Sequence, residues 1–157
     1  MGGVSSFFDY PGEEKQPADH VEPQLLPQWT ERQWDTLLQF TETIRFRRGQ
    51  PVVRAKDTDR SLLIVVEGRL EAHVPTGFST RRFPLGPGSL IGEVAFFDGE
   101  PRSADVVAAS DGELLRLGPA GFEEFSARHP GLARELLMSL GQMLASRLRR
   151  AEQLATP

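Results

Sequence analysis

The spacing of apolar side chains divides the chain into a helical part, a β-rich part and a second helical part. The first helical part begins at Thr30, which with Gln33 has the spacing of a capping box. Apolar side chains then recur at helical spacing: Trp34, Leu37, Leu38 and Phe40. This pattern predicts a helix over about residues 31–41.

Short β-rich runs follow this helix and are broken by glycines such as Gly49 and Gly68. The runs are TIRFRRGQPVVRA, SLLIVVEGRLEAHV, TRRFPLGP, SADVVAAS and GELLRLG. Strands this short, at this spacing, predict an antiparallel sandwich or barrel such as a jelly roll, over about residues 43–117.

Helical periodicity returns near the end of the chain and predicts two helices over about residues 119–153. The first begins at Pro119 and stops before Pro130, since proline suits the first turn of a helix and not its interior. The second carries an apolar stripe that packs on the barrel, on a second copy of the chain, or on both. The stripe consists of Leu132, Leu136, Leu137, Leu140, Met143, Leu144 and Leu148.

The length of 157 residues suits one domain with a hydrophobic core. Residues 1–24 are rich in Gly, Pro, Ser and acidic residues and lack sustained periodicity, so we interpret them as a disordered or loosely packed N-terminal arm. Phe7, Phe8 and Tyr10 are aromatic exceptions within this arm. The domain itself is assigned to residues 25–157.

The formal net charge of −4 comes from the N-terminal part of the chain. Residues 1–29 hold five of the 22 acidic side chains but only one of the 18 basic ones, so residues 30–157 are balanced and offer no basic excess to a nucleic acid. The absence of cysteine excludes disulfides, thiolate metal sites and cysteine nucleophiles. The sequence contains neither an apolar run of the roughly 20 residues that cross a bilayer nor a secretory pattern, so we expect a cytoplasmic location without membrane contact.

The segment GSLIGEVAFFDGEPRSADV, residues 88–106, holds more glycine and charge than a plain turn requires. Gly92 permits close approach to a ligand, and backbone N–H groups at the start of a short helical turn attract an anion such as phosphate. Arg102 and Ser103 can bind the same phosphate. Glu93 can accept a hydrogen bond from a sugar hydroxyl attached to it. These residues predict a pocket for a sugar phosphate, and hence for a nucleotide.

The segment GEVAFFDGEPRSA resembles the phosphate-binding cassette of the cyclic nucleotide-binding domain family, which includes the catabolite activator protein and the regulatory subunits of protein kinase A. The family pattern is matched by Gly92, Glu93, Val94, Ala95, Arg102 and Ala104. The runs RFRRGQPVVRAKD and SLLIVVEGRLEAHV resemble the first strands of the family. The resemblance covers about residues 30–153 and implies a mainly β fold, a jelly-roll β-barrel with an N-terminal helix and two C-terminal helices.

The resemblance also implies a ligand contact for each matched residue. Arg102 would pair with the cyclic phosphate, and Glu93 would accept from the ribose 2′-hydroxyl, with Gly92 beside it. The backbone N–H groups of Ala95 and Ser103 would complete the phosphate site. Catalytic residues and a resident cofactor are not implied.

The last helix would cover the base of the nucleotide. Arg147 aligns near a helix position that sometimes faces the pocket, although a solvent-exposed arginine is the alternative. Members that recognise adenine through hydroxyls on this helix have them where this chain places Ala151 and Glu152, so the identity of the base stays open. Ser103 resembles a residue that weakly favours adenine, so cyclic AMP is the favoured ligand and cyclic GMP the alternative.

The function that follows is a cyclic nucleotide-sensing regulatory module rather than an enzyme. It would signal to an unidentified partner protein in trans through movement of its last helix, and form a homodimer through the same helix. The alternative is a protein-interaction module that keeps the fold without nucleotide binding. In transcription factors of the family a helix-turn-helix domain follows the last helix, whereas only LATP follows Gln153 here, so we expect no nucleic-acid binding.

Two further groups of residues, two phenylalanines and the histidines, are not assigned to a ligand or metal site. Phe96 and Phe97 are expected to serve as core and hinge packing rather than as base-stacking groups. The three histidines are far apart in sequence and in the predicted elements, so we predict no metal site: His20, His73 and His129.

Overall fold

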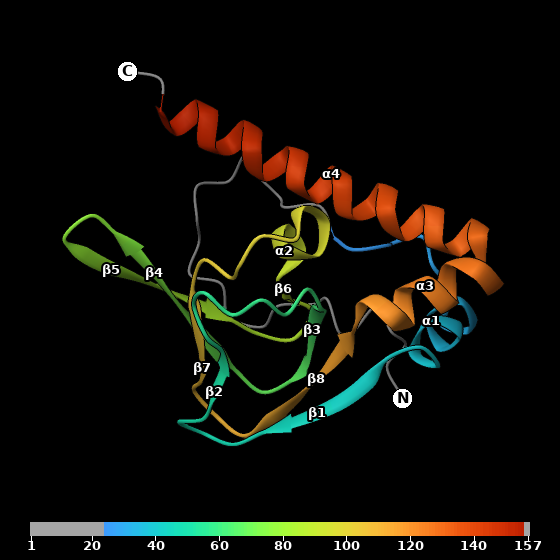
Figure 1. The fold of residues 1–157 in the computed structure, drawn as a ribbon, viewed down its shortest axis with the longest axis horizontal. Helices are drawn as coiled ribbons and strands as arrows, with labels where there is room; N and C mark the ends of the chain where they lie inside the picture. Colours follow the sequence, from blue (N-terminus) through green and yellow to red (C-terminus); the bar gives the residue numbers. More distant parts are fainter. Residues whose placement is uncertain (1–23, 156–157) are drawn as a thin grey trace.

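Two four-stranded antiparallel sheets form the centre of the fold in the computed structural model, which describes residues 24–155 (Figure 1). The first sheet consists, in spatial order, of β1 (Glu42–Phe46), β8 (Gly112–Leu117), β3 (Leu62–Glu67) and β6 (Leu90–Ile91). The second consists of β2 (Pro51–Val53), β7 (Asp105–Ala108), β4 (Leu70–Thr76) and β5 (Ser79–Leu85).

Four helices flank these sheets: α1 (Glu31–Leu38), α2 (Glu93–Asp98), α3 (Pro119–Arg128) and α4 (Pro130–Ala155). Figure 1 shows α1 and α3 beside each other at one end of the sandwich, while α4 runs across the side that carries α2. The short helix α2 therefore lies between the sheets and the longest helix. None of the helices in residues 24–155 is both long enough and apolar enough to span a bilayer.

The predicted mainly β jelly roll with an N-terminal helix and two C-terminal helices is confirmed. The barrel is not closed, however, because the strands separate into two sheets instead of forming one continuous sheet. The predicted capping box at Thr30 is present, with its hydroxyl accepting from the Gln33 amide. The helix that it begins ends at Leu38 rather than near residue 41, since Phe40 and Thr41 already donate to carbonyls three residues back. Residues 1–23 of the predicted arm lie outside the described part of the chain.

Two clusters of buried side chains hold these layers together. One lies between the sheets and includes Val65, Ile91 and Val106. The other joins the first sheet to α1, α3 and α4 through residues such as Leu117 and Phe125. The second cluster fixes α4 over the segment between β6 and β7, which carries the predicted cassette.

Helix α4 divides its apolar stripe between the interior and the surface. Leu136 and Leu140 are fully buried in the cluster beneath the helix, and Met143 is buried with them. Leu148, in contrast, is 61% exposed. Met138, which lies outside the predicted stripe, is 58% exposed. Packing on the sandwich therefore accounts for the first part of the stripe, and dimerisation through α4 stays a prediction.

Candidate ligand-binding site

The segment between β6 and β7 is organised around Gly92. The buried strand β6 ends one residue earlier, and Gly92 then takes a φ of 83°, in the left-handed region that favours glycine. Helix α2 begins at the next residue without a side-chain cap at its N-terminus. The first-turn N–H groups of α2 therefore have no capping side chain.

Arg102 is a buried cation in the loop that follows α2, and it is 6% exposed. Its Nη2 donates to the carbonyl oxygen of Ser61 at 2.5 Å and lies 3.8 Å from Oδ2 of Asp59. Its Nη1 is buried without a hydrogen-bond partner among the residues that the structure describes. A buried guanidinium donor without an acceptor is costly, and such a group is commonly completed by a ligand or an ion.

The unpartnered Nη1 lies directly against the backbone of Gly92. A Cβ atom built on Gly92 would overlap Nη1 and would also crowd the rest of the Arg102 guanidinium. Only glycine therefore allows both the left-handed backbone and this placement of the arginine. The structure brings Gly92 and Arg102 together, as the sequence predicts.

Glu93 is the acidic member of the same group and is 9% exposed. Its Oε1 forms an ion pair with Nη1 of Arg147, which comes from α4. Arg147 is half-buried, with 37% of its side chain exposed, so whether it faces a bound ligand or the solvent stays a prediction. The carboxylate predicted to meet a ribose is thus in direct contact with the helix predicted to move.

The remaining predicted residues differ in burial. Ala95 is buried within α2 and Ala104 is half-buried, whereas Ser103 is exposed. Val94 is also exposed, at 56%. Their predicted ligand contacts stay predictions.

The two phenylalanines of α2 do not share one role. Phe96 packs edge-on against Phe122 of α3, with ring centroids 5.2 Å apart, and joins the cluster beneath α4. Phe97 contacts the ring of Phe96 but is 42% exposed. Core packing is therefore the role of Phe96, and Phe97 is a surface residue.

Residues 54–61 hold Arg102 in place and were missed by the sequence analysis. The Lys56 amide donates to the Arg102 carbonyl at 2.7 Å, and the Arg102 amide donates to the Asp57 carbonyl at 2.8 Å. Asp59 and Ser61 contact the guanidinium, as described above. The only available signal was a polar run, AKDTDRS, between two apolar strands.

Asp59 is itself fixed by neighbours. Its Oδ1 accepts from the hydroxyl and the amide of Ser61, at 2.7 and 3.1 Å, and lies 3.3 Å from Nη2 of Arg116. Burial raises the pKa of Asp59, but these hydrogen bonds and the charges of Arg116 and Arg102 outweigh burial, so its pKa lies below the ordinary value. Burial also lowers the pKa of Arg102, opposed by Asp59, Asp57 and Glu93, and the guanidinium stays charged.

The lowered pKa of Asp59 predicts a pH dependence of stability. A carboxyl whose pKa is lower in the folded state stabilises the fold above its unfolded-state pKa of about 3.9, and this contribution is lost as the pH falls through the folded-state value. We expect the difference in unfolding free energy between wild type and Asp59→Asn to be largest near about pH 6 and to shrink below about pH 4. Urea unfolding across this range measures it, and a difference independent of pH would contradict the assignment.

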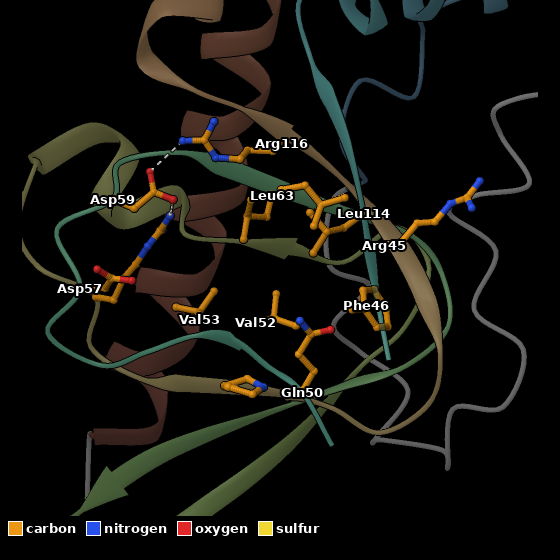
Figure 2. Close-up of a pocket in the computed structure, with 13 residues that line it drawn as sticks. Arg45, Phe46, Gln50, Val52, Val53, Asp57, Asp59, Leu63, Leu114 and Arg116 are labelled. Atoms are coloured by element: carbon orange, nitrogen blue, oxygen red, sulfur yellow. Dashed lines mark hydrogen bonds and ion pairs between the residues drawn. The ribbon is translucent and has the colours of Figure 1, made fainter. Parts of the chain in front are cut away.

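A cavity of about 260 Å³ opens beside Arg102, on the side of residues 54–61. Figure 2 shows Asp57, Asp59 and Arg116 at one part of its wall and apolar side chains such as Val53 and Leu63 at another. Gly92 and Glu93 are not among its lining residues. Arg102 thus lies between this cavity and Gly92, because it lines the cavity while its Nη1 lies against Gly92.

The histidines do not form a metal site in residues 24–155, where no three His, Asp or Glu side chains are grouped to hold an ion. His73 contacts Glu71 on β4, and His129 packs edge-on against Phe40. His20 lies outside the described residues.

Comparison with known families agrees with the geometry around Arg102. The model of the cyclic nucleotide-binding domain matches residues 43–129, more than half of the chain and including the whole cassette. The chain belongs to the cyclic nucleotide-binding domain family. The resemblance predicted from the residues around Gly92 and Arg102 is therefore confirmed.

Relatives of this cyclic nucleotide-binding domain occur in different proteins. The cyclic AMP receptor protein of Thermus thermophilus is 32% identical over 75% of this chain and 54% of its own length. A cyclic nucleotide-gated potassium channel of Mesorhizobium japonicum is 33% identical over 62% of this chain and 27% of its own length. The solved catabolite activator protein of Thermus thermophilus superposes with a TM-score of 0.69 at 30% identity, covering 78% of this chain and 56% of that protein. The chain thus spans between about a quarter and about half of these relatives.

Proposed function

We propose that this domain is a regulatory module that binds cyclic AMP and signals to a partner protein through movement of α4. The observation that carries the proposal is the buried Nη1 of Arg102, which has no hydrogen-bond partner among residues 24–155 and lies against Gly92 beside the start of α2. A cyclic phosphate is an anion small enough to accept from Nη1 and from nearby backbone N–H groups at once. The Thermus relative named as a cyclic AMP receptor supports cyclic AMP as the ligand.

Glu93 connects ligand binding to α4 in this proposal. A ribose 2′-hydroxyl donates to the Glu93 carboxylate, which already accepts from Arg147 of α4. The ligand and α4 therefore act on the same carboxylate, of which Oε1 contacts Arg147. If one arrangement of α4 places Glu93 better for the ribose, the ligand binds that arrangement more tightly. Ligand binding then raises the population of that arrangement.

The alternative is a protein-interaction module that keeps the fold without nucleotide. It would leave Arg102 held through Nη2 by Ser61 and Asp59 alone, with no ligand for Nη1. The two functions differ in what stabilises the folded domain. Under the alternative, added cyclic nucleotide leaves the stability of the domain unchanged.

A thermal shift titration separates the two functions. Cyclic AMP at about 100 times its dissociation constant should stabilise the folded domain by about 2.7 kcal/mol, because it binds only the folded state. Cyclic GMP measures base preference, and non-cyclic adenosine 5′-monophosphate is the control for general nucleotide effects. The absence of a shift with either cyclic nucleotide at millimolar concentration would favour the interaction module.

A further inference from the structure

Strands β1 and β2 are edge strands of the two sheets, and the cavity beside Arg102 lies between them. β1 pairs with β8 alone and β2 pairs with β7 alone, so each strand has one edge without a neighbouring strand. Residues 44–46 of β1 and residues 51–53 of β2 both line the cavity of about 260 Å³. The cavity is therefore bordered by the edge strands of both sheets.

The wall of this cavity is apolar where the two sheets face each other. Figure 2 shows Phe46, Val53 and Leu63, which come from three different strands, around the space. An apolar cavity of about 150 Å³ can hold benzene, so this one has room for at least one aromatic ring. An aromatic occupant would remove its own apolar surface and that of the wall from water. The apolar wall comprises Ile44, Phe46, Val52, Val53, Leu63 and Leu114.

The surface around the cavity is basic. Residues 45–56 hold five basic side chains and no acidic one. Within the described part of the chain, Arg45 alone of these five forms an ion pair, with Glu113 at 4.0 Å, and the Arg45 side chain is 89% exposed. The two aspartates of the cavity wall are balanced by two arginines of the same wall: Asp57, Asp59, Arg102 and Arg116. The other four basic residues are exposed: Arg47, Arg48, Arg54 and Lys56.

The first 23 residues of the chain carry the complementary chemistry. They hold five acidic side chains and one basic side chain, a net charge of −4. Their aromatic side chains lie within FFDY, residues 7–10, which includes Asp9 and is followed by Glu13 and Glu14. One short stretch thus combines aromatic rings for an apolar cavity with acidic groups for a basic rim. The proposed nucleotide site uses none of these residues.

The chain before the first described residue is long enough to reach the cavity. Sixteen residues separate Phe8 from Gln24, and an extended chain spans about 3.3–3.6 Å per residue, or about 53–58 Å in total. A compact domain of about 130 residues has a radius of gyration of about 14 Å, and hence a diameter of about 36 Å. Residues 7–10 are therefore able to reach any face of the domain.

We propose that residues 7–14 dock at the cavity between β1 and β2 of the same chain. A phenylalanine ring enters the apolar part of the cavity, and the acidic side chains lie against the basic residues 45–56. Exposed ion pairs contribute little each, so burial of the ring supplies most of the stabilisation, and the charges select this surface. The inference does not depend on nucleotide binding.

Paramagnetic relaxation in the full-length chain tests the proposal. The chain contains no cysteine, so Ser5→Cys provides a single attachment point for a nitroxide, two residues before Phe7. The amide signals of residues 44–53 and of Leu114 and Arg116 should broaden selectively. Reduction of the nitroxide should restore these signals.

Replacement of the two phenylalanines tests the role of the ring. Phe7→Ala combined with Phe8→Ala should lower the docking constant by at least about tenfold, because burial of one phenyl ring contributes that much. The selective broadening should then disappear. Broadening that persists in this variant would overturn the proposal.

Charge reversal at the rim tests the selection of this surface. Arg47→Glu combined with Arg48→Glu should lower the docking constant by about 2- to 30-fold, as for the loss of two exposed ion pairs. The matched control, Arg134→Glu combined with Arg149→Glu, makes the same charge change at exposed positions of α4, across the sandwich from β1 and β2 (Figure 1). The control should broaden the same signals as the chain without charge reversal. Equal losses in both variants would overturn the assignment of the basic rim.

A second copy of the chain is the other occupant that the measurement detects. Isotope-labelled wild type is mixed with unlabelled Ser5→Cys protein that carries the nitroxide, so that only docking between copies broadens the signals. Docking within one chain predicts no selective broadening in this mixture. Broadening there equal to that in the single-chain sample would identify a second copy and overturn the proposal. Broadening of the single-chain sample that is spread over the domain, or centred away from residues 44–53, would overturn it as well.

Discussion

Replacing Arg102 with alanine should weaken cyclic AMP binding by about 2–5 kcal/mol, the cost of truncating one partner of a buried charge pair. At about 1.4 kcal/mol per tenfold change, that is a loss of more than tenfold in affinity. The reason is that the guanidinium is buried and held on one side by Ser61 and Asp59, while Nη1 is left for an incoming anion. Isothermal titration of the purified variant measures the loss.

Two further variants separate the role of Arg102 in binding from its role in folding. Arg102→Lys keeps the charge but not the planar pair of donors, so it should bind cyclic AMP with an affinity between those of wild type and Arg102→Ala. Arg128→Ala removes an exposed arginine that pairs with Glu124 on α3 and should bind like wild type. A folded Arg102→Ala protein with wild-type affinity would show that the phosphate is not held there.

Replacing Gly92 with alanine should reduce both stability and binding. A φ of 83° is unfavourable for alanine by about 1–2 kcal/mol, and the added Cβ would overlap Nη1 of Arg102. The guanidinium must move away from the start of α2, so we expect destabilisation by about 1–3 kcal/mol. Cyclic AMP affinity should fall by at least about tenfold, as for loss of a charged contact. Urea unfolding and isothermal titration measure the two effects.

Gly49 provides the matched control for backbone strain. It has nearly the same dihedral, with a φ of 84°, but a Cβ there would meet no atom within 4 Å. Gly49→Ala should therefore destabilise the fold by about 1–2 kcal/mol and leave cyclic AMP affinity unchanged. Equal losses of affinity in Gly49→Ala and Gly92→Ala would mean that overlap with Arg102 is not the cause.

The cassette could be predicted because its signal is local. Gly92, Glu93 and Arg102 lie within eleven consecutive positions, and their spacing alone brings a glycine, an acid and a cation to one short helix. The alternation of apolar runs likewise predicted the strands. The runs left open whether those strands form a sandwich of two sheets or a closed barrel, because barrel closure depends on pairing between β1, β2 and their distant partners rather than on any single run.

Contacts between distant segments account for what the sequence analysis missed. Ser61 and Asp59 reach Arg102 across about forty residues, and no local pattern marks such a pair. Helical spacing predicted the apolar stripe of α4, but how α4 is rotated over the cassette depends on packing against the sandwich. That rotation brings Arg147 to Glu93, and helical periodicity alone left open whether this arginine faces the pocket or the solvent.

The most direct test is a crystal structure of the domain grown with cyclic AMP. The account predicts a phosphate oxygen within hydrogen-bond distance of Nη1 of Arg102 and of an N–H group near the start of α2, with the ribose 2′-hydroxyl donating to Glu93. A nucleotide bound elsewhere, with Nη1 still unpartnered and Glu93 paired with Arg147 alone, would contradict it.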